Sequence, residues 1–555
     1  MKDKILKNRN LINILVLILV GCFLCIPFLN SNLDVYNDDG IQHIARAFGT
    51  ANSILENGLL SNVISIFANN FGYSWNLFYG PLSTYGIIIA ELITGNFIVA
   101  YKLFCFICLI LSGYYMYKFA LKLIENNNAA LLAGILYMTF PYHLTDLYMR
   151  NALGEFVSFI FIPLVFLGLY NLFYTEDNHY YIAIGAIGLI LTHNISTLLV
   201  AIFALFYLIF NIEKLKETRI KKGLIVNIIF IVLITSFFWI PMIETGVSAR
   251  YKVFESGAMS STEKVTENTL KIRQLFVTQN DGSYIFELGP HTIIILAFSI
   301  MTFRRVKKEL KENYLIFLIF GLITLWMSTK YFPWKFLPDE LCIIQFPWRM
   351  LMLSAFFLNI VCAINMYTVI KNFNYKDVIV ISLIAIGYTT AFLPFLPIKE
   401  DGISQINDIK LGNFSGKDKE IVIGCGGGEY LPTNAHNDRF YIAAREDDIY
   451  VLEGKAIIED EEKSGVKLSA KLKTLEADYT VFELPYIYYP GYEVRLDGMI
   501  AETFETENGF LGIVMGKEDN AEISVDYKGT KSMYISMGIS IISLIIFIIY
   551  VWKKH

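Results

Sequence analysis

Residues 37–40 read Asn-Asp-Asp-Gly and follow the first long apolar stretch of the chain. If a helix begins at Asp38 or Asp39, then Asp39, His43 and Arg46 lie on one face, because positions four and seven residues apart share a side of a helix. A carboxylate, an imidazole and a guanidinium would then point the same way. Such a group could deprotonate an acceptor hydroxyl and hold an anionic leaving group. The simpler interpretation is a helix cap followed by a solvated stripe.

A second group of polar residues lies between 143 and 155. Asp146 and Arg150 are four residues apart, which is also the spacing of an exposed helical ion pair worth about 0.3–0.5 kcal/mol. His143 precedes them, and Glu155 stands where it could cap the next helix. His193 lies further along the chain between two short apolar stretches, where the simpler interpretation is a packed residue at a helix end.

The composition places these groups in a membrane protein. Of the 555 residues, 55% are hydrophobic and 17% are charged, and the apolar residues fall in long blocks. A crossing helix needs about 20 such residues to span a hydrocarbon core of about 30 Å. We expect the first block to be a retained helix, because no small-residue cleavage site follows it. The blocks lie near 11–30, 80–96, 98–117, 128–142, 156–174, 180–193, 195–211, 223–243, 290–303, 313–329, 348–370, 377–396 and 533–552.

Basic clusters set the expected orientation, because short cytoplasmic loops are rich in Lys and Arg. The clusters at 2–9, 214–222 and 304–311 must then share one side. They do so only if one early block does not cross, and 80–96, which opens with Gly-Pro, is best interpreted as an interfacial helix. The pattern predicts about twelve crossings with both termini cytoplasmic. The segments 31–97, 143–155, 244–289, 330–347 and 397–532 then lie outside, with His193 at the same surface.

Residues 397–532 change from a helical to a two-residue period. Val466, Leu468, Ala470 and Leu472 alternate with polar residues, and the same pattern returns near 492–496 and 523–527. Asp-Gly at 497–498 predicts a tight turn. We therefore predict an extracytoplasmic all-β domain, sandwich-like, held by helices at both ends. The glycines at 424–428 do not have the spacing of a phosphate loop, and a turn is the better interpretation.

Several classes of site are disfavoured by the sequence. The seven cysteines form no disulfide framework, although pairing of Cys342 with Cys425 stays open. Cys22 with Cys25 and Cys105 with Cys108 lie in apolar helices, where cysteine behaves as a small hydrophobe. No P-loop, metal-ligand spacing or aromatic-interleaved basic run is present. No metal ligand and no nucleic-acid partner are therefore predicted.

The outer clusters together resemble the GT-C superfamily of polytopic glycosyltransferases, which use polyprenyl-phosphate-linked sugars. The likeness lies in the acids Asp38 and Asp39 after the first helix, the Gly-Pro-Leu start at 80–82, and Asp146 in a second outer loop. More narrowly, the chain is similar to bacterial membrane proteins related to 6-pyruvoyl-tetrahydropterin synthase, a name that implies no pterin chemistry here. That likeness rests on Asp39-Gly40 with His43 and Arg46, and on the stretches 150–155, 346–349, 428–432 and 489–492.

The resemblance implies a glycosyltransferase that moves a sugar from a polyprenyl-phosphate donor to an outer glycan, lipid or protein acceptor. It implies catalytic carboxylates at Asp38, Asp39 and Asp146, and substrate or phosphate contacts from His43, Arg46, His143, Arg150, Glu155, His193 and Arg349. No cofactor is assigned, and a divalent metal stays open because metal dependence varies in the superfamily. The first-loop acids are adjacent and the Trp-Trp-Asp motif is absent, which disfavours N-linked oligosaccharide transfer.

The expected domains are a GT-C-like seven-helix catalytic module at 1–243, an outer loop with four further membrane helices at 244–396, the β domain at 397–532, and a last helix at 533–555. Two other functions stay open. A flippase for lipid-linked glycans would carry ionisable residues near the bilayer midplane, whereas here they cluster at the outer ends. A non-catalytic assembly or binding protein would be favoured if Asp39, Asp146 and Arg150 lay more than about 15 Å apart.

Overall fold

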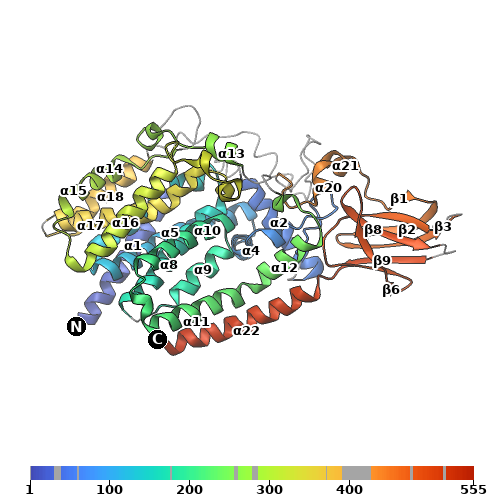
Figure 1. The fold of residues 1–555 in the computed structure, drawn as a ribbon, viewed down its shortest axis with the longest axis horizontal. Coiled ribbons are helices and arrows are strands. Elements are labelled where there is room, and N and C mark those ends of the chain that lie inside the picture. Colours follow the sequence, from blue (N-terminus) through green and yellow to red (C-terminus); the bar gives the residue numbers. More distant parts are fainter. Residues whose placement is uncertain are drawn as a thin grey trace.

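The chain folds into a helical body with a β domain at one end (Figure 1). The computed structural model describes residues 2–29, 39–58, 62–175, 178–255, 261–277, 285–370, 372–390, 427–475, 479–516 and 521–554. Helix α1 (Lys2–Leu24) begins, and α22 (Lys531–Lys554) ends, at the end of the body opposite the β strands. Asp38, Gly424, Cys425 and Gly426 lie outside the described residues, and so does the pairing of Cys342 with Cys425.

Within the described segments, five helices are long and apolar enough to cross a membrane. Two of them, α8 (Leu153–Tyr174) and α17 (Met350–Val369), form the centre of the body. Their apolar segments are 89% and 94% buried, whereas that of α22 is 22% buried. A sixth candidate is the pair α11 (Thr218–Ile234) and α12 (Ser236–Ser248), which is bent by 61°. The five are α5 (Phe97–Ile124), α8 (Leu153–Tyr174), α16 (Lys308–Met327), α17 (Met350–Val369) with the preceding 3-10 turn Pro347–Arg349, and α22.

Shorter helices fill the rest of the body. Helix α4 corresponds to the block predicted to lie at the interface, and the block predicted at 128–142 divides into α6 and α7 because Pro141 starts a new helix. The number of crossings and their direction remain predictions. The shorter helices are α2 (Gly40–Asn57), α3 (Trp75–Phe78), α4 (Leu82–Thr94), α6 (Asn127–Met138), α7 (Pro141–Tyr148), α9 (Tyr181–Ile190), α10 (Asn194–Phe210), α13 (Thr262–Glu267), α14 (Pro290–Ala297), α15 (Ser299–Thr302), α18 (Tyr375–Thr390), α20 (Thr433–Asn437) and α21 (Arg439–Ala444).

The β domain contains two antiparallel sheets that share one hydrophobic core. One sheet has the order β1-β4-β8-β7 and the other β2-β3-β9-β5-β6. Phe482 and Ile513 enter the core from the first sheet, and Leu472 and Ile523 from the second. The strands are β1 (Tyr450–Glu453), β2 (Ala456–Ser464), β3 (Lys467–Thr474), β4 (Tyr479–Ile487), β5 (Tyr492–Leu496), β6 (Met499–Ile500), β7 (Thr503–Glu505), β8 (Phe510–Gly516) and β9 (Ala521–Tyr527).

The predicted alternation and turns of this domain are confirmed. Every second residue of β3 is buried, from Leu468 to Thr474. Asp497 and Gly498 join β5 to β6 with positive φ angles of 49° and 82°, the conformation that a two-residue hairpin turn requires. Gly428 lies in a turn at φ 74° and does not open a long helix. The strands thus follow directly from the two-residue period.

Candidate functional site

The second polar cluster is positioned by the short connection between α7 and α8. Asn151 adopts a left-handed conformation at φ 46°, which Asn tolerates better than most residues, and its side-chain amide donates to the Leu147 carbonyl oxygen at 2.6 Å. The chain reverses there, so that Arg150 at the end of α7 faces Glu155 in the first turn of α8. A local turn therefore brings together residues from two helices.

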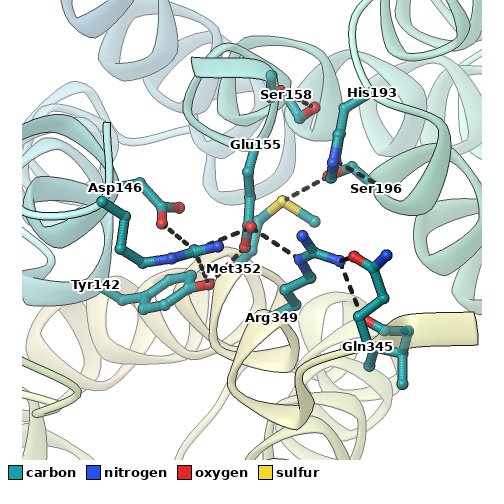
Figure 2. A network of polar contacts seen from close by, with 12 residues as sticks. Tyr142, Asp146, Glu155, Ser158, His193, Ser196, Gln345, Arg349 and Met352 are labelled. Carbon is teal, nitrogen blue, oxygen red and sulfur yellow. Dashed lines mark hydrogen bonds and ion pairs between the residues drawn. The ribbon is translucent and has the colours of Figure 1, made fainter. Parts of the chain in front are cut away.

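Glu155 is the centre of a buried ionic network (Figure 2). Its Oε2 lies 3.1 Å from Nη1 of Arg150 and 3.3 Å from Nε of Arg349. Its Oε1 accepts a hydrogen bond from the Tyr142 hydroxyl at 2.5 Å. Arg150 also pairs with Oδ1 of Asp146 at 2.5 Å. We call these five residues the Glu155 network. It joins α7, α8 and the turn before α17.

The charged side chains of the Glu155 network are buried. Asp146 is 0% and Glu155 is 1% exposed, so each must be compensated inside the protein. Oδ2 of Asp146 is buried and has no hydrogen-bond partner among the described residues. Burial and the neighbouring Glu155 raise the pKa of Asp146 well above its usual range, against the opposing effect of Arg150. Burial therefore favours the protonated form of Asp146.

Arg349 extends the network toward α10. Its Nη1 donates to the Gln345 side-chain oxygen at 2.7 Å and to the Ile344 carbonyl oxygen at 3.0 Å. Figure 2 shows His193 and Ser196 on the side of Glu155 opposite to Asp146 and Tyr142. His193 caps α10: its Nδ1 accepts from the Ser196 backbone amide and lies 2.7 Å from the Ser196 hydroxyl. The network and the start of α10 are therefore neighbours.

The first outer loop contacts the second through its backbone. Asp39 occupies the N-cap position of α2, and its backbone amide donates to the Arg150 carbonyl oxygen at 3.2 Å. The Asp39 carboxylate makes no capping hydrogen bond to this helix. Asp39 is exposed, in contrast to Asp146. The separation that would have favoured a non-catalytic protein is not observed between Asp39 and Arg150.

His43 and Arg46 are buried, so the interpretation of a solvated stripe is wrong. The three guanidinium nitrogens of Arg46 donate to Oδ1 of Asn76 at 3.0 Å and to the carbonyl oxygens of Tyr79 and Gly80 at 2.8 and 3.3 Å. These bonds hold the segment after α3. They use three of the five N–H donors of the guanidinium, so Arg46 braces this loop. Its predicted contact with phosphate stays a prediction.

Tyr79 connects the two histidines of the site. Its ring centroid lies 5.9 Å from that of His43 and 6.0 Å from that of His193. A Cβ atom added at Gly154 would collide with the Tyr79 hydroxyl, so the glycine lets Tyr79 reach the start of α8. Burial, with the nearby Arg46 and His193, lowers the pKa of His43 to about 3. His43 is therefore neutral at neutral pH.

Gly80 brings the same loop against the chain before α10. A Cβ at this position would lie 2.5 Å from the carbonyl carbon of Leu191, and the Leu82 amide donates to the Leu191 carbonyl oxygen at 2.8 Å. The two backbones therefore pack directly. This contact fixes Tyr79 relative to His193.

His143 does not join the group. Its ring stacks on Phe159 with centroids 3.8 Å apart and planes 3° apart, and its Nδ1 lies 3.1 Å from the Tyr137 carbonyl oxygen. His143 is 0% exposed, and aromatic side chains surround it. His143 therefore packs among core aromatic side chains, and its predicted contact with substrate stays a prediction.

Several residues of the site were not predicted. Tyr142 lies one helical turn before Asp146, and this spacing could have indicated it. Gln345 and Arg349 are also four residues apart, but Gln345 adopts an unusual φ of 64° that no sequence pattern indicates. Tyr79 is one of many aromatic residues in the predicted outer segments, and its sequence neighbours give no sign of a special role. Its position between two histidines depends on the packing of three segments distant in the sequence.

Metal binding was also left open by the sequence. Among the described residues, no three His, Cys, Asp or Glu side chains are grouped closely enough to hold a metal ion. The two carboxylates of the Glu155 network, Asp146 and Glu155, are both paired with Arg150. These residues could themselves transfer a proton and bind an anion.

A family model described as "6-pyruvoyl-tetrahydropterin synthase related domain; membrane protein" matches residues 77–395. The chain belongs to this family. The matched region contains Asp146, Arg150, Glu155, His193 and Arg349 and begins after α2. The family is one of membrane proteins, which agrees with the apolar helices described above.

Two individual proteins are similar to this member of the family. An uncharacterized protein of Lactococcus lactis subsp. cremoris (strain MG1363) is 27% identical over 341 residues, which are 59% of this chain and 55% of that protein. The chain thus matches about half the length of this relative. The cryo-EM structure of the arabinofuranosyltransferase AftD from Mycobacteria aligns with 70% of this chain and 27% of its own, with a TM-score of 0.47 and 13% identity. That likeness is too distant to carry an argument.

Proposed function

We propose that this membrane protein is a glycosyltransferase that moves a sugar from a polyprenyl-phosphate donor to an extracytoplasmic acceptor, such as a glycan, lipid or protein. The observation that carries the proposal is the meeting of the two outer loops. An exposed carboxylate, Asp39, has its backbone bonded to that of Arg150, whose guanidinium belongs to a buried network with a second arginine, Arg349. The proposed base is therefore joined through its backbone to one of two cations that suit a phosphate.

The proposed reaction is a displacement at the anomeric carbon of the sugar. The acceptor oxygen forms a bond to that carbon, the bond from the carbon to the phosphate oxygen breaks, and the acceptor proton passes to the Asp39 carboxylate. The leaving polyprenyl phosphate keeps the electron pair and its negative charge. Arg150 and Arg349 stabilise that charge, which is where a preorganised cation contributes most.

Asp39 is a better candidate for the base than Asp146. Its carboxylate is exposed, whereas that of Asp146 is fully buried and paired with Arg150. Burial also raises the pKa of Asp146, so its protonated form is favoured. In this proposal Asp146 orients Arg150 and does not itself accept a proton. His43 and His193 form the wall opposite, on either side of Tyr79.

The test replaces one oxygen of the proposed base. Asp39→Asn should reduce the surface glycan product by about a hundredfold or more, the usual size of a general-base effect, while the protein still reaches the membrane. The matched control is Asp497→Asn, an exposed turn residue of the β domain that Asn can replace without strain. Product formed at the wild-type level by Asp39→Asn would contradict the proposal.

A non-catalytic assembly protein is the second candidate. It is favoured by the Glu155 network, since ion pairs among three segments have a structural role whether or not any chemistry takes place. The Asp39→Asn experiment separates the two candidates, because Asp39 makes none of these ion pairs. If cells that carry Asp39→Asn assemble a normal envelope and form as much product as the wild type, this second candidate would be favoured.

A further inference from the structure

The loop between α2 and α3 is held by the β domain. The side-chain amide of Asn69 donates to the carbonyl oxygen of Ile442 at 3.0 Å, and the backbone amide of Ile487 donates to that of Phe71 at 2.9 Å. The Phe71 ring contacts Phe510 at 5.1 Å, and the guanidinium of Arg445 lies 5.2 Å from its centroid. Phe71 is fully buried in the core of the β domain. This part of the first outer loop therefore behaves as a piece of that domain.

The same loop contacts the segment 427–432, which precedes the strands. The backbone amide of Tyr430 donates to the Tyr73 hydroxyl at 3.1 Å, and the Tyr430 carbonyl oxygen accepts from the Tyr489 hydroxyl at 2.9 Å. The Tyr430 ring stacks on Phe78, with centroids 5.2 Å apart and planes 5° apart. Tyr489 stacks in turn on Tyr251 at 5.8 Å. Two of the sequence motifs quoted above, 428–432 and 489–492, thus meet at one joint.

This joint is one residue away from the site. Phe78 precedes Tyr79, whose ring lies between His43 and His193 and whose carbonyl oxygen is held by Arg46. The Tyr430 ring also lies 6.0 Å from that of Tyr73 and 6.5 Å from that of Trp75, so it lies beside the first outer loop. A path of direct contacts therefore runs from the core of the β domain to the wall of the site.

We propose that Tyr430 is a positioning residue of the site, through which the β domain holds Phe78 and Tyr79 in place. The stack on Phe78 fixes the backbone after α3, and that backbone sets both the Tyr79 ring and the carbonyl oxygens that hold Arg46. The β domain is then part of the architecture that positions the site. The expected effect on product rests on the proposed transferase function. The mechanical coupling between the β domain and Tyr79 does not depend on that function.

The test compares two substitutions of Tyr430 in the full-length protein. Tyr430→Phe keeps the stacked ring and Tyr430→Ala removes it. Loss of the stacked ring should loosen the local structure only. Hydrogen–deuterium exchange of peptides covering residues 74–80 should therefore accelerate about tenfold in the Ala variant and stay within about threefold of the wild-type rate in the Phe variant. Surface glycan should fall about tenfold or more in the Ala variant and be restored in the Phe variant.

The control is Phe440→Ala, an aromatic residue of the same domain that is 71% exposed on α21 and should change neither measurement. Tyr430→Leu, which fills space without a stacked ring, should behave as Tyr430→Ala. Unchanged exchange in the Ala variant would overturn the proposal whatever the activity, as would equal loss of product in the Phe and Ala variants. Failure of both the Ala and Leu variants to accumulate would overturn it too, by making Tyr430 a residue of folding. Accelerated exchange with no glycan product from the wild-type protein would leave the coupling standing and contradict the transferase function.

Discussion

His43 is a buried histidine next to a buried arginine. Its ring is 6% exposed, and Arg46 on the next helical turn is 0% exposed. A second positive charge at this place would be costly, which is why the neutral imidazole is favoured. His43 is therefore suited to accept or donate a hydrogen bond at neutral pH, and less suited to carry a charge.

The depressed pKa of His43 makes the stability of the protein depend on pH. The native pKa is about 3, below the value of about 6.5 expected in the unfolded chain. The native state then binds fewer protons, so this contribution is fully present above about pH 6.5 and is lost as the pH falls toward 3, by up to about 1.4 kcal/mol per pH unit. We expect His43→Gln to reduce the fall in unfolding midpoint between pH 7 and pH 5.

The measurement is thermal unfolding of the detergent-solubilised protein at both pH values. His436→Gln is the matched control, because His436 is only half-buried on α20 and its removal should flatten the pH dependence less. An identical pH dependence in His43→Gln and the wild-type protein would contradict the assignment of a neutral, buried His43.

At the residue scale, the sequence predicts types and short spacings but not burial. The pairing of Asp146 with Arg150 follows from their spacing of four. Their burial does not, since a pattern of polar residues near a membrane surface is equally typical of a solvated loop. The ion pair of Glu155 with Arg349 joins residues 194 positions apart, and only the packing of α8 against α17 brings them together.

At the element scale, Glu155 connects three parts of the helical body. It lies in α8, accepts from Tyr142 in α7, and pairs with Arg349 in the turn before α17. Removal of one partner from a buried ion pair leaves an uncompensated charge, which costs about 3–5 kcal/mol. In this network, two guanidinium groups would lose the same carboxylate.

We therefore expect Glu155→Ala to lower the free energy of unfolding by about 3–5 kcal/mol. The matched control is Ser158→Ala, one turn later in α8, because Ser158 is equally buried but bonds only to the Gly154 carbonyl oxygen of its own helix. Both can be measured as unfolding midpoints in detergent. A loss of stability as small as that of Ser158→Ala would show that the Glu155 network is not structural.

The periods of the sequence predict most elements, but not where they break. The two-residue period predicts β3, β5 and β9, and long apolar blocks predict α8 and α22. The block at 223–243 is apolar apart from Asn227, Thr235 and Ser236, and it divides at Thr235 into α11 and α12 with a bend of 61°. The buried hydroxyl of Ser236 at this break bonds to the Ser536 carbonyl oxygen in α22. This bond joins the break to a helix 300 residues further along the chain.

At the scale of the whole molecule, the β domain and the two chain ends lie at opposite ends of the helical body (Figure 1). The predicted topology, in which both ends are cytoplasmic and the β domain is outside, stays a prediction. The direction of insertion is a separate prediction, since no membrane is part of the fold.

Cysteine labelling of intact cells tests the direction of insertion. We expect a membrane-impermeant thiol reagent to label Asp497→Cys in the β5–β6 turn and to leave Lys216→Cys, in the basic loop before α11, unlabelled until the cells are opened. Both positions are exposed, and the wild-type protein gives the background from its own cysteines. Labelling of Lys216→Cys in intact cells would reverse the topology and place Asp497 inside.

Arg46 carries a charge that its surroundings do not cancel. Its donors go to an amide and two carbonyl oxygens, its guanidinium lies over the Trp75 and Tyr79 rings, and no carboxylate of the described residues forms an ion pair with it. Burial lowers the pKa of Arg46 to about 10, which leaves it protonated at neutral pH. Because dissolved salt screens buried charges weakly, the surroundings of Arg46 keep a positive potential that depends little on ionic strength. An anionic headgroup would be drawn toward Tyr79 before any side chain has moved.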